Sequence, residues 1–519
     1  MSLNRKVTRS PIGRLTKSSS HPGQAGISLD DQLASRLPLR RSPRVRSRAI
    51  DGVEPTPMRR CGGRPYHALH RDEPCDPEPS PRRHAHRLRR AGHRGRVRDA
   101  ARRSERRTLH LTNVESIVAG RMYRISPTSG SESHQAPLYY GVLAAWQKAL
   151  GIPPFGLALR GTGVAIRSSP HWLHDGATAM ADQRRLDLLR LPGIAMGLAT
   201  IALTWLAVRC LSKDPWTPVI AAAIVAFVPR FVFLSGVINN DNLATLLGAL
   251  VTFLAAWLVS RRPDRTRVRV AWAAASGAVL GAALLAKVTA VVVGPGLFLA
   301  LLVVARRPRE RLVLVSVMAT GALAVCGWWF VRNQLVYGDP LGEAASVAHL
   351  RALYPNLFPT GSLLVRVLVS IPVGVWRSAW YTSGWNQFSW PPLAYLPFWI
   401  LLGIGGAAAI AGLARRSTAL PDAPADTHAS ETTASRSRAG IAILATIALG
   451  GAAAIWIVGL QTTQAQARIG YVGLPAVAGL AAIGYERLRW PTVARLALPA
   501  LGLVGTLIAI RADVLGVFH

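Results

Sequence analysis

Residues 270–305 read VAWAAASGAVLGAALLAKVTAVVVGPGLFLALLVVA, two runs of Ala, Leu, Val and Gly that are interrupted by a single charge, Lys287. A helix that crosses about 30 Å of hydrocarbon needs about 20 mostly apolar residues, and each run comes within a few residues of that length. Hydrocarbon offers no hydrogen-bond partners, so the backbone of such a run must satisfy itself as a helix. The stretch therefore predicts two membrane-spanning helices joined at Lys287.

Similar apolar runs occur on both sides of this stretch. Half of the residues are hydrophobic and only 17% are charged, a composition that argues against a soluble nucleic-acid-binding protein. We predict an all-α, polytopic transmembrane bundle over 188–511. Its ten expected spans are 188–211, 217–236, 242–260, 270–286, 288–305, 312–331, 392–414, 440–460, 469–485 and 494–511. The segment 363–379 contains Arg366 and resembles an interfacial helix more than a span.

Basic residues are unevenly distributed over the loops between these spans. Five loops hold 18 Lys and Arg, and they are 209–213, 261–269, 306–311, 415–438 and 487–495. The alternate loops hold six, which are Lys287, Arg332, Arg351, Arg366, Arg377 and Arg468. Cytoplasmic loops carry the excess of Lys and Arg. The alternate loops are therefore expected to be extracytoplasmic in the plasma membrane, and residues 111–187 form the first of them.

The first 110 residues have a different composition. They hold 27 Lys and Arg against 10 Asp and Glu, and Tyr66 is their one aromatic residue. Such a segment buries too little apolar surface to offset ordering, so we predict that it is disordered. It lacks the aromatic series of an RNA-binding arm, and we expect no nucleic-acid partner. An amino-acid sequence rich in Arg, Pro and His also results when GC-rich DNA is translated in a wrong reading frame. Mistranslation is therefore a second interpretation of this segment.

Polar residues of chemical interest gather in the loops predicted to be extracytoplasmic. They are Glu132–Tyr140, Asn239–Asn242, Lys287, Trp328–Asn333 with Tyr337–Pro340, Trp380–Trp390, and Gln464–Arg468 with Tyr471. Charged groups at membrane edges are costly and often mark a ligand path. Each also has an ordinary interpretation: the aromatic residues as an interfacial belt, Asp241 as a helix N-cap, and Lys287 as a snorkelling residue. Arg230, beside Pro229, is also expected to snorkel.

These clusters resemble the motifs of a known group. His134-Gln-Ala-Pro-Leu-Tyr-Tyr140 is similar to the His-x-Pro-Pro-Leu-Tyr-Tyr element of the GT-C glycosyltransferases, which use polyprenyl-phosphate sugars and include the protein O-mannosyltransferases (glycosyltransferase family 39). The Asn-Asn-Asp-Asn loop, the Lys287 hairpin and the later clusters follow in the expected order, so the likeness covers about 112–511. Ala136 departs from the pattern, and so does the Arg468 element, which lacks the usual Gly.

The resemblance implies a reaction and a site. It implies inverting transfer of a sugar from a polyprenyl-phosphate donor to a glycan or protein acceptor. The sequence shows no metal-ligand cluster, so we expect no cofactor and no divalent metal. The resemblance also implies a carboxylate base, for which the candidates are Asp72, Glu73 and Glu132. Expected phosphate ligands, suited by their charge and by the donor fork of Arg, are Lys287, Arg332 and Arg468. Expected sugar and acceptor ligands are His134, Gln135, Tyr139, Tyr140, Asn240, Asp241, Trp385, Gln387 and Tyr471.

Two other interpretations remain. A lipid or polysaccharide transporter or flippase should place its charges near the bilayer midplane and often has internal repeats. The charges of this chain lie at the ends of the spans, and its two halves show no repeat. The chain is alternatively an inactive, truncated product, since no apolar run before residue 112 supplies the first span that the resemblance implies.

Overall fold

The structure is a computed structural model that describes residues 107–126, 129–155, 176–383, 388–414 and 427–515. All of these residues belong to one compact unit, Pro79–His519. Four of the expected site residues, Asp72, Glu73, Trp385 and Gln387, lie outside the described residues, as does the basic segment up to residue 106.

Long apolar helices make up most of the described chain. Seven are long and apolar enough to cross a membrane: α4 (Gly176–Leu211), α7 (Asp241–Arg261), α8 (Thr266–Ala286), α10 (Pro308–Tyr337), α14 (Leu396–Ala414) with η4 (Pro392–Tyr395), α15 (Thr427–Gln461), and α16 (Leu474–Arg487) with η5 (Ala467–Gly473). The bent pair α5 (Trp216–Ala226) and α6 (Pro229–Ser235) is the eighth. Two shorter apolar helices are η1 with α9 (Val288–Val293, Gly294–Val304) and α18 (Ala497–Leu515). Every expected span has its counterpart, so the all-α multi-pass prediction is confirmed.

The break between α5 and α6 follows from a proline. The two helices meet at 67°, and Val228, directly before Pro229, is extended with ψ 111°. A residue before proline avoids the helical region because the proline ring would clash with it. The bend turns α6 into the bundle, so that Arg230 of α6 is buried.

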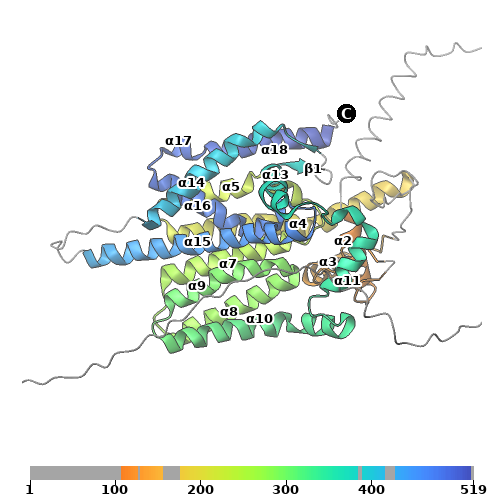
Figure 1. The fold of residues 1–519 in the computed structure, drawn as a ribbon, viewed down its shortest axis with the longest axis horizontal. Helices are drawn as coiled ribbons and strands as arrows, with labels where there is room; N and C mark the ends of the chain where they lie inside the picture. Colours follow the sequence, from red (N-terminus) through yellow and green to blue (C-terminus); the bar gives the residue numbers. More distant parts are fainter. Residues whose placement is uncertain (1–106, 127–128, 156–175, 384–387, 415–426, 516–519) are drawn as a thin grey trace, which may run out of the picture. The chain divides into compact units, whose positions relative to one another are not determined.

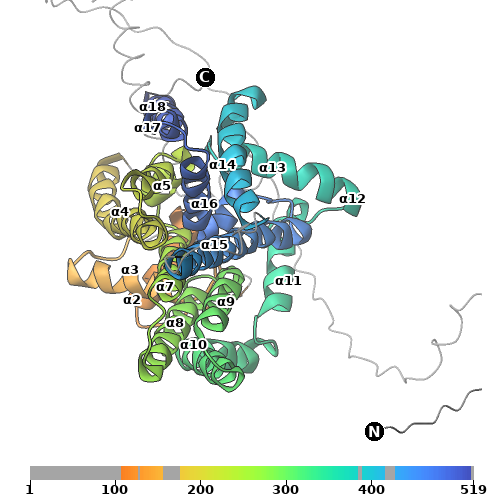
Figure 2. The ribbon, with the colours of Figure 1, turned by 90° about the vertical axis from the view of Figure 1, so that its left-hand side faces the viewer.

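The helices pack closely where glycine removes the side chain. Gly277 and Gly281 of α8 lie against α10, and a Cβ on either would overlap the carbonyl oxygen of Met318 or Ala322. Small residues at such a contact let two helix backbones approach closely. Seen end-on, α7 and α16 lie near the middle of the helices (Figure 2). Their spans are 72% and 83% buried, against 17% for the span that contains α14.

The loops gather at two ends of the bundle, as the arginine count predicts (Figure 1). At the arginine-rich end, Asp214 pairs with Arg495, Asp264 pairs with Arg306, and Arg269 Nε donates to Glu310 at 2.7 Å. These ion pairs join loops far apart in the sequence. The opposite end, which carries the alternate loops, is called the polar end below.

Two helices at the polar end lie at the start of the described residues. Helix α2 (Arg107–Val118) begins within the segment predicted as disordered to residue 110, and α3 (Leu138–Ala149) lies within the expected loop 111–187. Helix α4 begins at Gly176, before the predicted 188. The reason is burial: α2 packs against α3, and Leu111 and Val114 of α2 are at most 2% exposed. This apolar face outweighs the basic composition around it.

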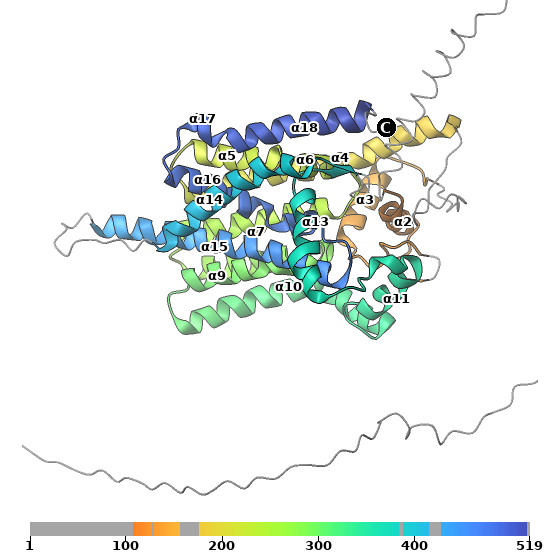
Figure 3. The same cartoon turned by 45° about the horizontal axis from the view of Figure 1, so that its top comes forward.

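Short elements complete the polar end (Figure 3). They are α11 (Glu343–Leu353), η2 (Pro355–Leu357), α12 (Leu363–Val365), the π-helical turn η3 (Arg366–Ser370), α13 (Ile371–Ser378), β1 (Thr382–Ser383) and β2 (Phe388–Ser389). Helix α17 (Thr492–Arg495) precedes α18 at the other end. The two strands pair antiparallel with Thr382 opposite Ser389. Residues 363–378 form no long apolar helix, in keeping with an interfacial segment.

Candidate functional site

Asp241 lies at the first position of α7 and points away from its own helix. The side chain of Asn239 accepts the backbone N–H of Asp241 at 3.0 Å, so this asparagine closes the turn before the helix. The Asp241 carboxylate makes no capping bond and is 4% exposed. Its interpretation as an N-cap was therefore wrong, because Asn240 occupies the N-cap position and Asp241 follows it. Asn239 Nδ2 donates to Asp241 Oδ2 at 3.1 Å, and side chains from other elements supply the further partners of this carboxylate.

Two cations converge on this carboxylate. Lys287 Nζ forms an ion pair with Oδ1, and Arg468 Nη1 donates to Oδ2 at 2.6 Å. Lys287 lies between α8 and η1, where its backbone is extended with φ −161°. This conformation lets its side chain reach the Asp241 carboxylate. Arg468 stands near the start of η5, and its Nε donates to Gln466 Oε1 at 2.6 Å. Asp241, Lys287 and Arg468 are called the charge cluster below.

The charge cluster is buried and positively charged. The side chains of Lys287 and Arg468 are 13% and 7% exposed. Two cations and one carboxylate leave a formal charge of +1 in a region where charges are costly to desolvate. A singly charged anion such as a phosphodiester would neutralise it, and the Arg and Lys donors suit phosphate oxygens.

Hydrogen bonds connect Asn240, the neighbour of Asp241, to the loop before α3. Asn240 Nδ2 donates to Gln135 Oε1 at 3.0 Å. The amide nitrogen of Gln135 donates to Glu132 Oε2 at 3.1 Å and contacts His134 Nε2 at 2.9 Å. Glu132 is 6% exposed. One continuous chain of side chains therefore leads from Asp241's neighbour to a buried carboxylate.

The hydrogen bonds of His134 fix its tautomer. Nδ1 lies 2.8 Å from the carbonyl oxygen of Ser131, which only accepts, so Nδ1 carries the proton. Nε2 then accepts from Gln135. Burial lowers the pKa of His134 below its usual 6.5, against the raising effect of the Glu132 carboxylate. His134 is therefore a neutral positioning group in this network.

The adjacent tyrosines point in different directions. Tyr139 accepts the backbone N–H of Asn239 at 2.8 Å and lies against the loop that carries Asp241. Tyr140 lies 2.7 Å from His110 Nδ1. Burial raises the pKa of both phenols, so both stay neutral. Both are at most 1% exposed, which is incompatible with a lipid-facing belt.

Two other expected ligands make their hydrogen bonds to residues outside the charge cluster. Arg332 donates to the carbonyl of Tyr123 at 2.9 Å and stacks 4.8 Å from the Trp329 ring. Tyr123 in turn donates to the carbonyl of Gln135 at 2.9 Å. Arg332 thus supports the loop that carries Gln135, and its phosphate-binding role stays a prediction. Tyr471 donates to the carbonyl of Ala379 at 2.7 Å.

Sequence reasoning missed two buried residues. Arg230 was expected to snorkel, but it is 6% exposed and donates to the carbonyl of Thr382, because the bend at Pro229 turns it inward. His110 is 1% exposed. Its burial was not predicted because the residues before it are rich in arginine. The apolar spacing of Leu111 and Val114 was the available signal for this helix.

The described residues contain no group of three His, Cys, Asp or Glu side chains that could hold a metal ion. Asp339 stabilises the turn before α11, since its carboxylate accepts the backbone N–H groups of Leu341 and Glu343. These N–H groups lower the pKa of Asp339.

Asp241 and Lys287 both fall within a region that resembles a known family. Residues 169–330 match the family model of dolichyl-phosphate-mannose-protein mannosyltransferase. This mannosyltransferase match agrees with the GT-C resemblance of the motifs, and it includes two of the three residues of the charge cluster. It ends before Arg332 and Arg468.

Solved structures give more distant similarities. ArnT from Cupriavidus metallidurans bound to undecaprenyl phosphate is 13% identical, with a TM-score of 0.46 over 83% of this chain and 77% of that one. The Archaeoglobus fulgidus oligosaccharyltransferase tethered to an acceptor peptide is also 13% identical, with a TM-score of 0.38 over 83% and 54%. Apo ArnT gives 13% identity and 0.32 over 79% and 78%. No curated protein matches the chain.

Proposed function

We propose that this chain is a membrane glycosyltransferase that transfers a sugar from a polyprenyl-phosphate donor to a glycan or protein acceptor on the extracytoplasmic face of the plasma membrane. The observation that carries the proposal is the buried charge cluster, whose formal charge of +1 suits one phosphodiester. The mannosyltransferase match over 169–330 supports it, since the family's description names a polyprenyl-phosphate sugar donor.

In the proposed reaction, Lys287 and Arg468 bind the phosphate of the donor. The bond between the anomeric carbon and the phosphate oxygen breaks, and the two cations stabilise the charge that develops on the leaving phosphate. Asp241 acts as a positioning residue that holds both cations. The prenyl chain lies against the apolar outer faces of the helices, which gives the enzyme a reason to be in a bilayer.

Glu132 is the proposed catalytic base among the described residues. The acceptor hydroxyl attacks the anomeric carbon from the side opposite the phosphate, and Glu132 takes its proton, so the configuration inverts. Gln135 and Asn240 link Glu132 to the residue that precedes Asp241 in the chain. Asp72 and Glu73 are the alternative bases.

Replacing Glu132 with glutamine is expected to lower the turnover number by about 10²–10⁴-fold, since general base catalysis contributes about that much. The matched control is Glu115→Gln, because Glu115 accepts from Gln147 at 2.8 Å and from the backbone of Phe155 instead. The measurement is transfer of labelled sugar in membranes that hold equal amounts of each variant. Full activity of Glu132→Gln with loss in Asp72→Asn or Glu73→Gln would assign the base to the upstream pair.

The proposed sidedness predicts a labelling pattern. A cysteine at Leu341, which is 50% exposed at the polar end, should react with a membrane-impermeant maleimide in intact cells that express the chain without its native cysteines. A cysteine at the exposed Arg265 should react only after permeabilisation. The reverse pattern would place the proposed site in the cytoplasm and exclude an extracytoplasmic reaction.

The transporter interpretation makes a different prediction. A transporter binds its substrate near the bilayer midplane, between discontinuous helices. The charge cluster instead joins the polar ends of α7 and α8 to η5. Release of free polyprenyl phosphate with each sugar transferred would support the transferase, whereas movement of intact donor between leaflets would support the transporter.

A further inference from the structure

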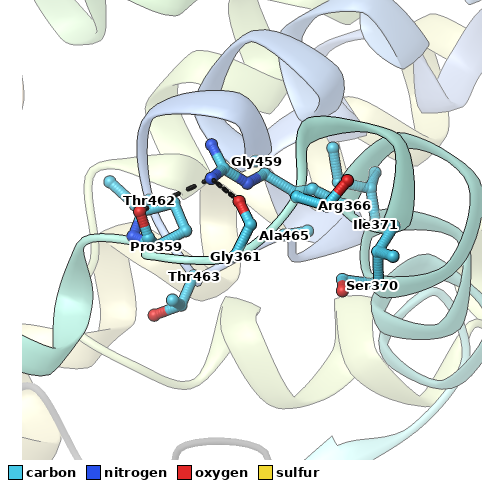
Figure 4. A pocket seen from close by; sticks show the side chains of 11 residues that line it. Pro359, Gly361, Arg366, Ser370, Ile371, Gly459, Thr462, Thr463 and Ala465 are labelled. Atoms are coloured by element: carbon cyan, nitrogen blue, oxygen red, sulfur yellow. Dashed lines mark hydrogen bonds between the residues drawn. The ribbon is translucent and has the colours of Figure 1, made fainter.

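A pocket of about 340 Å³ lies beside the segment 363–378, apart from the charge cluster. Residues 359–371 form one side of it, and the end of α15 with the following loop forms the other, including Gly459, Thr462 and Ala465. Figure 4 shows the Arg366 side chain extending across this space toward Gly361 and Pro359. The sequence and the proposed reaction give this arginine no role.

The charge of Arg366 has only neutral partners in the pocket. Nη1 donates to the carbonyl of Leu460 at 2.6 Å. Nη2 lies 3.4 Å from the carbonyl of Gly361 and 3.5 Å from that of Pro359. Bonds of that length are weak, so these N–H groups can turn to a stronger acceptor. The residues lining the pocket include no Asp or Glu. No carboxylate in the lining therefore competes with an anion for the Arg366 guanidinium.

The same segment also exposes large apolar side chains. Leu363, Leu364 and Leu368 are 63%, 66% and 64% exposed. Neighbouring leucines exposed to this extent are typical of a helix that lies in the membrane surface with its apolar side in the acyl chains. A pocket on the inner side of such a helix stands at the level of the lipid head groups.

We propose that this pocket binds the phosphate head group of a membrane lipid. Arg366 supplies the charge, and the hydroxyls of Ser362 and Ser370, which also line the pocket, supply further donors. The lipid chains lie against the exposed leucines of the same segment. The planar fork of Arg366 suits two phosphate oxygens at once. This site is separate from the charge cluster and does not depend on the proposed sugar transfer.

The test is binding of phosphatidylglycerol to the purified full chain, counted by native mass spectrometry. Arg366→Gln should weaken binding by at least about tenfold, because it removes a charge-assisted hydrogen bond. The matched control is Arg377→Gln, which removes an exposed charge from the same segment without touching the pocket. Both are measured in the Arg468→Ala background, so that lipid at the charge cluster does not obscure the result. Equal loss in both variants, or none in Arg366→Gln, would overturn the proposal.

A second variant guards against misfolding, since Arg366 also ties Leu460 to the segment. Ser370→Phe fills the pocket and leaves Arg366 in place, and it should abolish binding as well. Polyprenyl phosphate and inorganic phosphate distinguish the source of the anion. Binding of polyprenyl phosphate alone would support the site and identify its lipid, whereas inorganic phosphate binding as tightly as phosphatidylglycerol would overturn the assignment to a lipid.

Discussion

Replacing Arg468 with alanine is expected to lower sugar transfer from a polyprenyl-phosphate donor by about 10²–10³-fold, the cost of losing one donor that stabilises developing charge. Arg468 is buried, and its guanidinium is held by Gln466 on one side and Asp241 on the other. These two bonds leave the Arg468 guanidinium few other orientations. We therefore expect that no neighbouring side chain replaces it in the Arg468→Ala protein. The measurement is the rate of labelled-sugar transfer per folded protein in membranes.

Two variants sharpen this experiment. Arg468→Lys keeps the charge but loses the fork of donors, so its rate should fall between those of the wild type and Arg468→Ala. Arg377→Ala removes an exposed arginine at the same end of the bundle and should leave the rate unchanged. An Arg468→Ala protein that transfers sugar at the wild-type rate would remove this residue from the site.

Replacing Asp241 with asparagine is expected to destabilise the fold by about 3–5 kcal/mol, the cost of leaving a buried charge without its partner. The change raises the formal charge of the cluster from +1 to +2 while Lys287 and Arg468 stay buried. The measurement is the midpoint of unfolding of the purified protein in detergent, with the free energy of unfolding obtained from denaturant titration.

The control for this prediction is the ion pair at the other end of the bundle. Asp264 pairs with Arg306, but its side chain is 89% exposed, so Asp264→Asn should leave the midpoint almost unchanged. The double variant Asp241→Asn with Lys287→Met restores the formal charge of +1 and should recover part of the lost stability. An Asp241→Asn protein that unfolds at the wild-type midpoint would show that the two cations do not need this carboxylate.

Much of the candidate site could be predicted from the sequence, but not the way its parts meet. Asp241, Lys287 and Arg468 each stand at the end of an apolar run, where a charge is unusual enough to be noticed. Their partners could not be predicted, since Asp241 lies 46 positions from Lys287 and 227 from Arg468. Capping and ligand binding were equally good interpretations of Asp241 until Asn239 was seen to close the turn.

The residues that sequence reasoning misplaced are those whose surroundings come from other elements. Arg230 reads as a membrane-edge arginine, yet a bend at one proline places it against Thr382. His110 reads as part of a basic tail, yet it packs on Tyr140.

The sequence by itself determined the membrane-spanning helices and the division of their loops between two ends, because the need for about 20 apolar residues and the arginine bias both act along the chain. Only the tertiary structure decided that one carboxylate holds two cations and that a chain of amides leads from its neighbour to Glu132. Those contacts depend on distance and burial between separate helices, which no local pattern records.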